Sequence, residues 1–436
     1  MSSMLEPVSP ARADGGVELP PLTPWLPRVF KHPRLMHYNR LIALVFAGNL
    51  TALGYLLAEG PLSSRTMANA ALTDFALAVL ARQQYVINAL FWLATRAPTH
   101  WPLRIRWTLG KVYHFGGLHV GGAMTRTLWF LAMVADTVWN GTSTAELAVT
   151  LLLAALLAAI VGTALPPFRA RFHDRFERIH RFGGWAALAL LWAQTILVAH
   201  SDGRPLPSTP AVWVLASITL SVALPWLRLR RVSVTLDRPS SHVVLAHFDH
   251  GVTPFAGSST AVSRSPLRQW HSFANVPAPG RSGFRLTISR AGDWTGALID
   301  DLPERLWVKG ITTAGVANIE TLFTKVVYVA TGSGIGPCLP HLLAGKVPAR
   351  LVWATRSPRT TYGEALVEEI MAVQPDALVW DTAEHGKPDM VALAYAAYRD
   401  FGAEAVICIS NKKLTWLVVH QLERRGIPAF GAIWDS

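Results

Sequence analysis

The residues best suited to chemistry form a glycine-rich turn between an apolar segment and a second apolar run. The turn reads Thr-Gly-Ser-Gly-Ile-Gly-Pro from position 331. A turn that follows a strand and opens a helix suits phosphate binding, because glycines let the backbone approach a pyrophosphate and the helix N-terminus stabilises its charge. The competing interpretation is a plain strand-to-helix turn. The pattern predicts a dinucleotide site that contains Thr331, Gly332, Ser333, Gly334, Gly336 and Pro337.

Histidines recur in two similar apolar segments, YHFGGLHVGG and IHRFGGWAAL. A b-type haem with two histidine ligands needs one imidazole from each of two facing helices. His114 and His180 are the predicted pair, with His119 as the alternative ligand or a group behind it. The adjacent glycines would let a neighbouring backbone approach closely. Two other interpretations stay open: histidines that cap helix ends or meet lipid headgroups, and a non-haem metal site of His114, His119, His173 and His180.

Two arginines, Arg82 and Arg126, fall near the middle of apolar segments. A buried guanidinium needs an anionic partner, and Asp74 and Asp136 lie nearer the outer ends of the same segments. The sequence therefore favours a bound anion, either haem propionates or an acidic substrate. Hydrogen bonding between helices is the alternative.

The elements that would position these groups in the first half are apolar spans. They cover residues 38–57, 70–95, 107–134, 147–165, 185–199 and 212–227. Most approach the roughly 20 residues that cross a bilayer, and the basic residues gather in alternate loops, which predicts cytosolic N- and C-termini. The net charge of +12 then reflects topology, and we expect no nucleic-acid partner. The prediction is a six-helix transmembrane bundle over residues 37–230, multi-pass in the inner (cytoplasmic) membrane.

The second half has the pattern of a soluble protein. Short alternating strands over residues 231–321 predict a small antiparallel β-barrel. Strands that alternate with helices over residues 322–436 predict an α/β domain with a parallel sheet. The first 30 residues lack the apolar core of a signal peptide, and residues 1–36 are predicted to be a disordered tail. Cys338 and Cys408 lie in the cytosolic half, so no disulfide is expected.

Two motifs in this half carry a family resemblance. Trp270-His271-Ser272-Phe273-Ala274 resembles the His-Pro-Phe-Thr/Ser flavin motif of the ferric reductase/NADPH oxidase branch of the ferredoxin–NADP reductase superfamily, with Ser272 in place of proline. Gly292-Asp293-Trp294-Thr295 resembles the segment that faces the flavin diphosphate. Residues 38–436 as a whole are most similar to transmembrane flavoproteins typified by the fungal conidiation-associated oxidoreductase TmpA. The shared stretches include KVYHFGGLHVGG, FHDRFERIHRFGGW and GIPAFGAIWDS.

The resemblance implies roles for individual residues. FAD would be bound by Trp270, His271, Ser272, Phe273, Trp294 and Thr295. The nicotinamide end would meet Cys408, Ser410 and Asn411, and Trp434 would stack on the flavin. Cys408 as a buried apolar residue and Trp434 as a core residue are the alternatives. Arg356 follows the second strand of the parallel sheet, where an arginine suits a 2′-phosphate, so NADPH is favoured over NADH.

The chain departs from the ferric reductase branch in its histidines. That branch places haem ligands fourteen positions apart, and here those positions after His114 and His180 are Leu128 and Gln194, so at most one haem fits. The expected function is a membrane-bound NAD(P)H-dependent FAD oxidoreductase that passes electrons to an unidentified acceptor. The alternatives are an enzyme that modifies a lipophilic or acidic intermediate with the same cofactors, and a non-enzymatic nucleotide-binding sensor or transporter.

Overall fold

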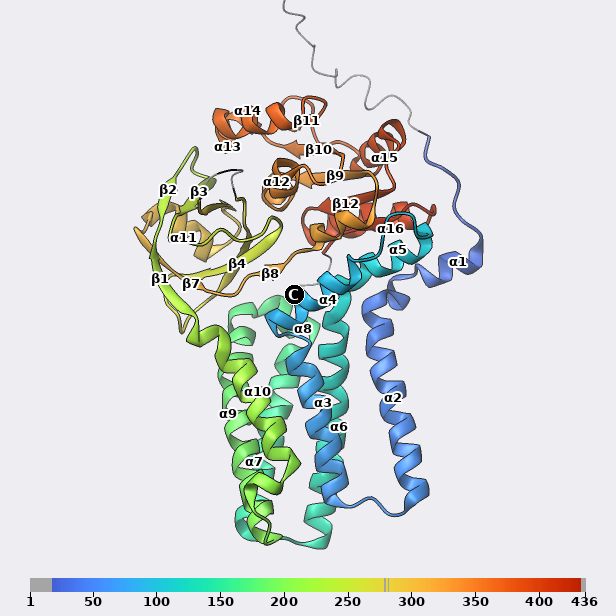
Figure 1. Ribbon diagram of the computed structural model, residues 1–436, viewed down its shortest axis with the longest axis vertical. Coiled ribbons are helices and arrows are strands. Elements are labelled where there is room, and N and C mark those ends of the chain that lie inside the picture. The colour runs from blue at the N-terminus through green and yellow to red at the C-terminus, as the bar shows by residue number, and fades with distance from the viewer. Residues whose placement is uncertain (1–17, 278–279, 281, 433–436) are drawn as a thin grey trace, which may run out of the picture.

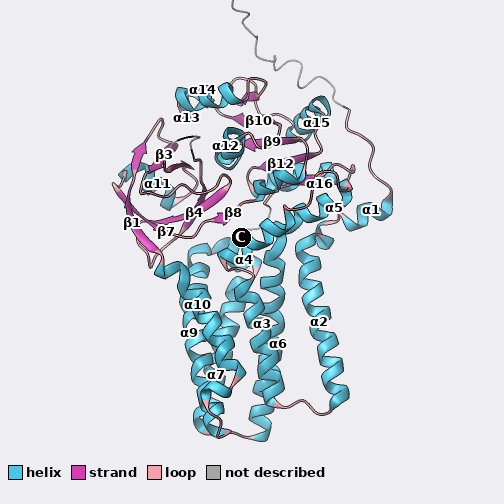
Figure 2. Cartoon of the chain, in the orientation of Figure 1, coloured by secondary structure: helices cyan, strands magenta, loops and turns pink. Residues whose placement is uncertain are grey.

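A computed structural model describes residues 18–277, 280 and 282–432. Long helices run side by side in a stem, and the strands lie together in a head above one end of it (Figures 1 and 2). Within the described residues, six long helices make the stem: α2 (His37–Glu59), α3 (Ser64–Leu80), α6 (Gly116–Asn140), α7 (Thr144–Ala164), α9 (His173–Ser201) and α10 (Pro210–Leu227). Short helical segments precede or connect them: α1 (Trp25–Phe30) and η2 (Pro33–Leu35) come before α2, and α4 (Gln84–Ala94), α5 (Leu103–Leu109), η3 (Gly110–Phe115), α8 (Pro166–Arg171) and η4 (Leu206–Ser208) lie between stem helices.

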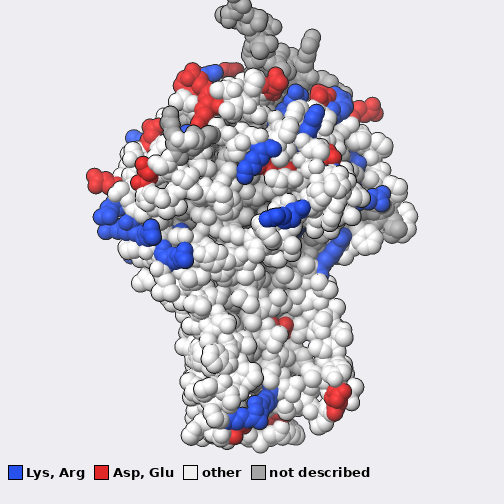
Figure 3. Space-filling view, in the orientation of Figure 1, with Lys and Arg blue, Asp and Glu red and all other residues white. Residues whose placement is uncertain are grey.

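Among the described residues, four of the stem helices, α2, α7, α9 and α10, are long and apolar enough to cross a membrane. Helices α3 and α6 do not meet that standard, and they carry the buried side chains of Asp74 and Arg126. The visible face of the stem is almost free of charge between its two ends (Figure 3). Of the six crossings that the sequence predicts, length and composition therefore support four, those of α2, α7, α9 and α10.

Glycines let α6 pack closely against its neighbours, as the sequence indicated. A Cβ atom at Gly117 would lie 2.3 Å from the carbonyl oxygen of Tyr38, and one at Gly121 would lie 2.9 Å from the Cβ of Val45, both in α2. A Cβ at Gly122 would lie 2.8 Å from the carbonyl oxygen of Asp74 in α3. Backbone approach of this kind is typical of helices that associate in lipid.

Two expected spans differ from the structure. The span over 70–95 stops at Leu80, because the Gln83 side chain caps a new helix by accepting hydrogen bonds from the backbone N–H groups of Tyr85 (2.6 Å) and Val86 (3.0 Å). Helix α4 belongs to the head side, where the Asn88 side chain donates to the carbonyl oxygen of Thr312 at 2.9 Å. Likewise, residues 107–115 belong to α5 and the 3₁₀ turn η3, and α6 begins only at Gly116.

The expected disordered tail also contains ordered structure. Residues 18–36 include α1 and η2, and the backbone N–H of Thr23 donates to the carbonyl oxygen of Arg424 at 3.0 Å. The Arg425 guanidinium donates to the carbonyl oxygen of Pro20 at 3.1 Å. Residues 1–17 lie outside the described residues.

The first part of the head is antiparallel, as expected, and its strands form two sheets, which together we call the barrel. Its elements are β1 (Leu229–Ser233), β2 (Thr235–Asp237), β3 (Val243–Phe248), β4 (Ser258–Ser263), β5 (His271–Ala274), β6 (Phe284–Ser289), α11 (Asp293–Asp301), β7 (Arg305–Lys309), β8 (Thr313–Ala314) and the 3₁₀ turn η5 (Val316–Leu322). One sheet has the order β1-β7-β4-β5, with β8 beside β4, and the other has the order β2-β3-β6. Alternate residues such as Val244, Leu286 and Val308 fill a shared core.

The second part is a parallel sheet of order β11-β10-β9-β12-β13 covered by helices on both faces. Its elements are β9 (Val326–Thr331), the 3₁₀ turn η6 (Gly332–Gly334), α12 (Ile335–Ala344), β10 (Ala349–Thr355), α13 (Pro358–Tyr362), α14 (Glu364–Val373), β11 (Leu378–Asp381), α15 (Met390–Phe401), β12 (Ala405–Ile409), α16 (Lys412–Glu423) and β13 (Ala429–Phe430). The strand order reverses direction beside β9, so the crevice for a ligand is expected at the carboxyl end of that strand.

Candidate functional site

The glycine turn lies at that carboxyl end and opens α12. Gly332 has a φ of +51°, which L side chains rarely adopt. A Cβ atom at Gly334 would lie 2.0 Å from the carbonyl oxygen of Ile409 in β12, so only glycine lets the turn pack on that strand. The Trp353 indole N–H donates to the carbonyl oxygen of Gly332 at 2.9 Å and holds the turn against β10.

Other predicted nucleotide residues gather at the same edge of the sheet. The Thr331 and Ser410 hydroxyl groups hydrogen-bond to each other across β9 and β12. Arg356 directly follows β10 and is exposed, so its guanidinium is available to a phosphate. The Asn411 side chain is already engaged, since it accepts a hydrogen bond from the backbone N–H of Leu414 at 3.0 Å and caps α16.

The predicted flavin residues meet at one side of the barrel. The rings of His271 and Trp294 lie 4.3 Å apart between centroids, and Phe273 stacks on Trp294 at 6.3 Å. The Thr295 hydroxyl accepts hydrogen bonds from the backbone N–H groups of Ala291 (2.9 Å) and Gly292 (3.1 Å), which shapes the start of α11.

Two members of the motif lie elsewhere. Ser272 is exposed, because successive residues of a strand point to opposite faces. The Trp270 ring turns toward the stem, where it meets Trp226 of α10 at 6.3 Å between centroids, and the Lys309 ammonium of β7 lies 4.8 Å from its centroid.

Two buried polar atoms near the barrel and α12 have no partner. They are Nε2 of His271 and Oγ1 of Thr287, while the Ser289 side chain interacts with that of Tyr362. A Cβ at Gly336 would lie 3.3 Å from the Cβ of Thr287, so the start of α12 touches β6 at this point. Burial lowers the pKa of His271, which favours a neutral ring able to donate or accept one hydrogen bond. Buried polar groups without partners favour a bound polar ligand, and these residues fit a flavin between the barrel and the glycine turn.

The sequence prediction did not include Thr287, Ser289 or Tyr362. Tyr362 is buried, and its hydroxyl would lie 3.5 Å from a Cβ placed at Gly332. These residues carry no motif, and only the packing of β6 and α13 against the glycine turn reveals them. In β6 the polar residues Arg285, Thr287 and Ser289 alternate with apolar ones, a pattern that from sequence predicts a solvent-facing side rather than a site.

Cys408 does not reach this site. Its side chain has no exposed surface and packs in the apolar cluster between the sheet and α15 and α16. Burial raises the pKa of the thiol to about 12, so it stays protonated. The structure therefore assigns Cys408 to the core rather than to the nicotinamide. Trp434 lies outside the described residues.

The predicted haem pair is not brought together. His114 lies in η3 and stacks on His37, with 6.0 Å between ring centroids. His180 instead faces His119, with 6.1 Å between centroids, while Nδ1 of His119 lies 2.8 Å from the carbonyl oxygen of Ala78. Helix α6 begins after His114, so only His119 projects toward α9. The described residues contain no group of three or more His, Cys, Asp or Glu side chains able to hold a metal ion, and His173 is mostly exposed.

Arg126 lies near a carboxylate, Asp74, which the sequence analysis placed nearer the outer end of its span. Arg126 lies over the Phe75 ring at 4.7 Å, and its charge interacts with that of Asp74. Asp74 accepts a hydrogen bond from the Asn49 side chain at 3.2 Å, yet its Oδ2 and the Nε of Arg126 are both buried without a partner. The Arg82 guanidinium lies 5.9 Å from the centroid of Phe115.

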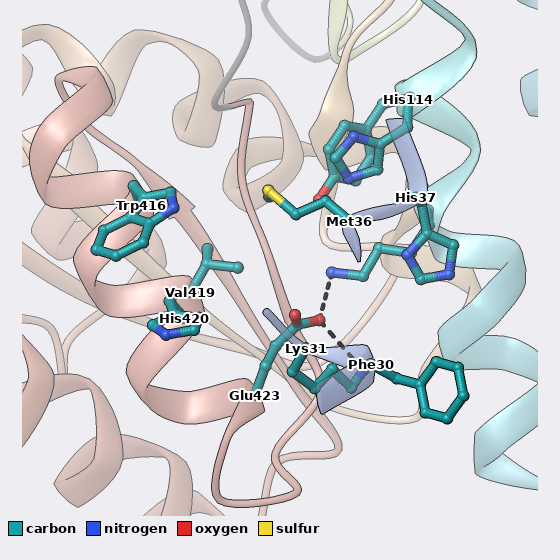
Figure 4. Close-up of a pocket in the computed structure, with 11 residues that line it drawn as sticks. Phe30, Lys31, Met36, His37, His114, Trp416, Val419, His420 and Glu423 are labelled. Carbon is teal, nitrogen blue, oxygen red and sulfur yellow. Dashed lines mark ion pairs between the residues drawn. The ribbon is translucent and has the colours of Figure 1, made fainter. Parts of the chain in front are cut away.

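A polar cluster around Glu423 joins the stem to the head (Figure 4). Lys111 and Lys31 share Glu423, with Nζ–Oε1 distances of 2.6 and 3.8 Å. Lys111 also donates to the carbonyl oxygen of Ala429 at 2.7 Å, next to β13. Burial lowers the pKa of Lys31 to about 8, and burial also lowers the pKa of His114. The cavity here has a volume of about 20 Å³, room for about one water molecule.

Residues 316–436 match the sequence family described as "Adenylate-forming reductase 03009, C-terminal domain". Two curated relatives come from Coprinopsis cinerea. Adenylate-forming reductase 03009 is 43% identical over 423 residues, and adenylate-forming reductase 06235 is 40% identical over 421 residues. Each match covers 94% of this chain. Neither of these two relatives carries the name of a TmpA-type or ferric reductase protein.

Solved structures of flavin reductases are similar to the head at low identity. A ferredoxin–NADP⁺ reductase from Neisseria gonorrhoeae, with bound FAD and NADP, has 12% identity and a TM-score of 0.38, and the match covers 47% of this chain and 98% of that one. The flavohaem-like FAD/NAD-binding domain of nitric oxide dioxygenase from Vibrio cholerae has 14% identity and a TM-score of 0.34, with the same coverage. The chain spans about two fifths, 41%, of the length of the two curated relatives.

Proposed function

We propose that this chain is an NAD(P)H-dependent FAD oxidoreductase whose stem crosses a membrane and whose head faces the cytosol. The observation that carries the proposal is that α12, which the glycine turn opens, packs on β5 and β6, where the side chains of His271 and Thr287 each keep a buried polar atom without a partner. A dinucleotide at the turn and a flavin on the barrel would then be neighbours. The reductase names of both curated relatives support the same class of reaction.

The residues of the head have separable tasks in this proposal. When bound, FAD accepts a hydride from the nicotinamide and passes electrons onward. Gly332 and Gly334 let the backbone approach the dinucleotide, and the exposed Arg356 would bind a 2′-phosphate, which favours NADPH. His271 and Trp294 would hold the ring system, while Thr295 keeps the start of α11 open to the flavin phosphates.

The acceptor is proposed to bind at or in the stem. Asp74 and Arg126 each keep one buried polar atom without a partner. His119 and His180 meet one another in the same bundle. These groups could orient a polar acceptor between α3, α6 and α9. A single b-type haem is the other way to use the two histidines, and the ligands would then be His119 and His180 in place of His114.

Absorption spectra of the detergent-solubilised protein, before and after NADPH, test this function. Flavin absorbance that bleaches on addition of NADPH is the expected result. His271→Ala should lower the FAD content, whereas His242→Ala, on an exposed turn of the same barrel, should not. A colourless protein that neither retains added FAD nor oxidises NADPH overturns the proposal and leaves the nucleotide-binding sensor or transporter. A Soret band that is lost in His119→Ala and His180→Ala would add the haem.

A second candidate follows from the relatives. Because both are named adenylate-forming reductases, the chain could supply the reductive step for a carboxylic acid that another domain has activated. Hydride addition to the activated acyl carbon and loss of its leaving group would give an aldehyde. NADPH oxidation that depends on an added acyl thioester, with aldehyde as product, favours this candidate over simple electron acceptors such as ferricyanide.

A further inference from the structure

A cavity of about 400 Å³ lies where the stem meets the barrel, apart from the flavin and nucleotide residues. We call it the junction cavity. The residues that line it come from the end of α10, from β1, β4, β6 and β7, and from the loops after β3 and β7: Leu227, Arg228, Leu229, Arg230, His250, Val252, Pro254, Thr260, Phe284, Val308, Lys309, Gly310 and Thr312. Helix α10 is one of the helices able to cross a membrane, and it ends at Leu227. The cavity is therefore at the level where a bilayer surface would lie.

The charges around the junction cavity have one sign. Arg228, Arg230 and Lys309 line it, and none of the described residues that line it is acidic. The two carboxylates whose charges act on Lys309 and His250 do not line the cavity, and each has a closer partner. Glu177 pairs with Arg181 at 3.8 Å, and Asp249 accepts a hydrogen bond from Ser282 at 3.2 Å.

Among the described residues Lys309 forms no ion pair, although the charge of Glu177 acts on it from farther away. Its ammonium group lies 5.2 Å from the ring centroid of Trp226 and 4.8 Å from that of Trp270. Burial, and then the charge of Arg181, lower the pKa of Lys309 to about 8. His250 also lines the cavity and has its Nδ1 buried without a partner. A ligand with negative charge and hydrogen-bonding oxygens would satisfy both groups.

The mouth of the junction cavity is apolar. Leu227 and Val252 line it and remain 74% and 39% exposed. Phe284 and Val308 form an apolar inner wall. A free inorganic anion would use the cationic wall alone, whereas a phospholipid would also cover the apolar residues near the end of α10.

We propose that the junction cavity binds the phosphate-bearing headgroup of an anionic phospholipid, with the acyl chains leaving past Leu227. This inference rests on the membrane part of the proposed function. The bound lipid would fix the barrel against the bilayer surface, because β1 continues directly from α10. Arg230 and Arg231 provide a matched pair: both are exposed in β1, but they point to opposite faces of the strand and only Arg230 lines the cavity.

Lipid retention by the full chain in detergent tests the proposal by native mass spectrometry and thermal unfolding. Phosphatidylglycerol should remain bound and raise the unfolding temperature, whereas phosphatidylcholine at the same concentration should do so much less. Arg228→Gln combined with Arg230→Gln should weaken phosphatidylglycerol binding about thirtyfold, at roughly fivefold for each charge lost. Arg231→Gln should keep wild-type binding.

Three results would overturn the proposal. Equal retention of the two lipids would show no headgroup preference, and equal loss in Arg231→Gln would show only diffuse surface charge. Inorganic phosphate that raises the unfolding temperature as much as phosphatidylglycerol would show a free-anion site. FAD content and extraction by alkaline carbonate, measured on the same preparations, separate these results from a failure of the proposed function, which would give a colourless or carbonate-extracted protein.

Discussion

At the scale of single residues, the glycine turn makes the sharpest demand on side-chain size. Gly334→Ala places a Cβ atom 2.0 Å from the carbonyl oxygen of Ile409, so the start of α12 must move away from β12. We expect the KM for NADPH to rise at least about tenfold, since a displaced helix start loses its contact with the phosphates. NADPH oxidation by the purified variant measures the change.

Gly345→Ala, at the other end of α12, is the matched control. Gly345 has a φ of +56° and open space around its Cβ position. Alanine there should cost about 1–2 kcal/mol of stability through backbone strain and leave the KM unchanged. An equal rise of the KM in both variants would show that strain in α12, rather than the contact with β12, controls NADPH binding.

Individual residues also show what a linear sequence leaves open. The resemblance put Cys408 beside the nicotinamide. In a parallel sheet both faces are covered by helices, so the sequence does not show which face a side chain occupies. In the structure the Cys408 thiol faces α15 and α16. Asp74 seemed too far from Arg126 because the second span was extended to residue 95. With α3 ending at Leu80, Asp74 lies closer to the head and interacts with Arg126.

At the scale of elements, the polar cluster between α1, η3 and α16 predicts that removing the charge of Lys31 stabilises the protein. Lys31 and Lys111 share one carboxylate, and burial holds the pKa of Lys31 near 8, below the ordinary 10.5. Between these values the unfolded chain binds a proton that the folded chain does not, so stability contributed at Lys31 rises with pH. Lys31→Met should therefore raise the unfolding temperature at pH 7 by roughly 2–4 °C, corresponding to about 1 kcal/mol.

The advantage of Lys31→Met over the wild type should shrink between pH 8 and 10, which thermal unfolding in detergent can follow. Lys111→Met should lower the unfolding temperature at every pH in that range, because it removes the 2.6 Å pair with Glu423 and the bond to the carbonyl oxygen of Ala429. Destabilisation by Lys31→Met at pH 7 would contradict the charge argument.

The order of helices and strands could be predicted from the sequence for the head, but the helix boundaries of the stem could be predicted only in part. Alternating and continuous apolar runs are strong signals, and they gave the antiparallel barrel and the parallel sheet. Apolar content alone could not separate α3 from α4, since the break depends on the Gln83 side chain capping a new helix. Nor could it show that residues 107–115 contact Glu423 and Phe430 rather than lipid.

At the scale of the whole molecule, the arrangement of stem and head predicts which side of a membrane each loop faces. Helix α7 has 21 residues and spans about 32 Å, close to the roughly 30 Å hydrocarbon core of a bilayer. Ser143, exposed just before α7, should therefore face the side opposite the head. In inverted vesicles, where the head faces outward, a membrane-impermeant maleimide should label Ser357→Cys and spare Ser143→Cys.

The native cysteines do not interfere with this measurement, because Cys338 and Cys408 have no exposed surface. Rupture of the vesicles with detergent should make Ser143→Cys reactive and serves as the control. Labelling of both introduced cysteines in sealed vesicles would exclude a stem that crosses the membrane in this orientation.

The contact of β13 with η3 has a consequence for how the protein is made. A Cβ at Gly110 would lie 2.7 Å from the Phe430 ring, and Lys111 bonds to Ala429, so a segment between two stem helices packs on a strand more than three hundred residues later in the chain. A ribosome releases the stem helices long before it has synthesised that strand. Until then Lys111 has neither Glu423 nor Ala429 to pair with, so this lysine must stay hydrated after the stem helices have already been made.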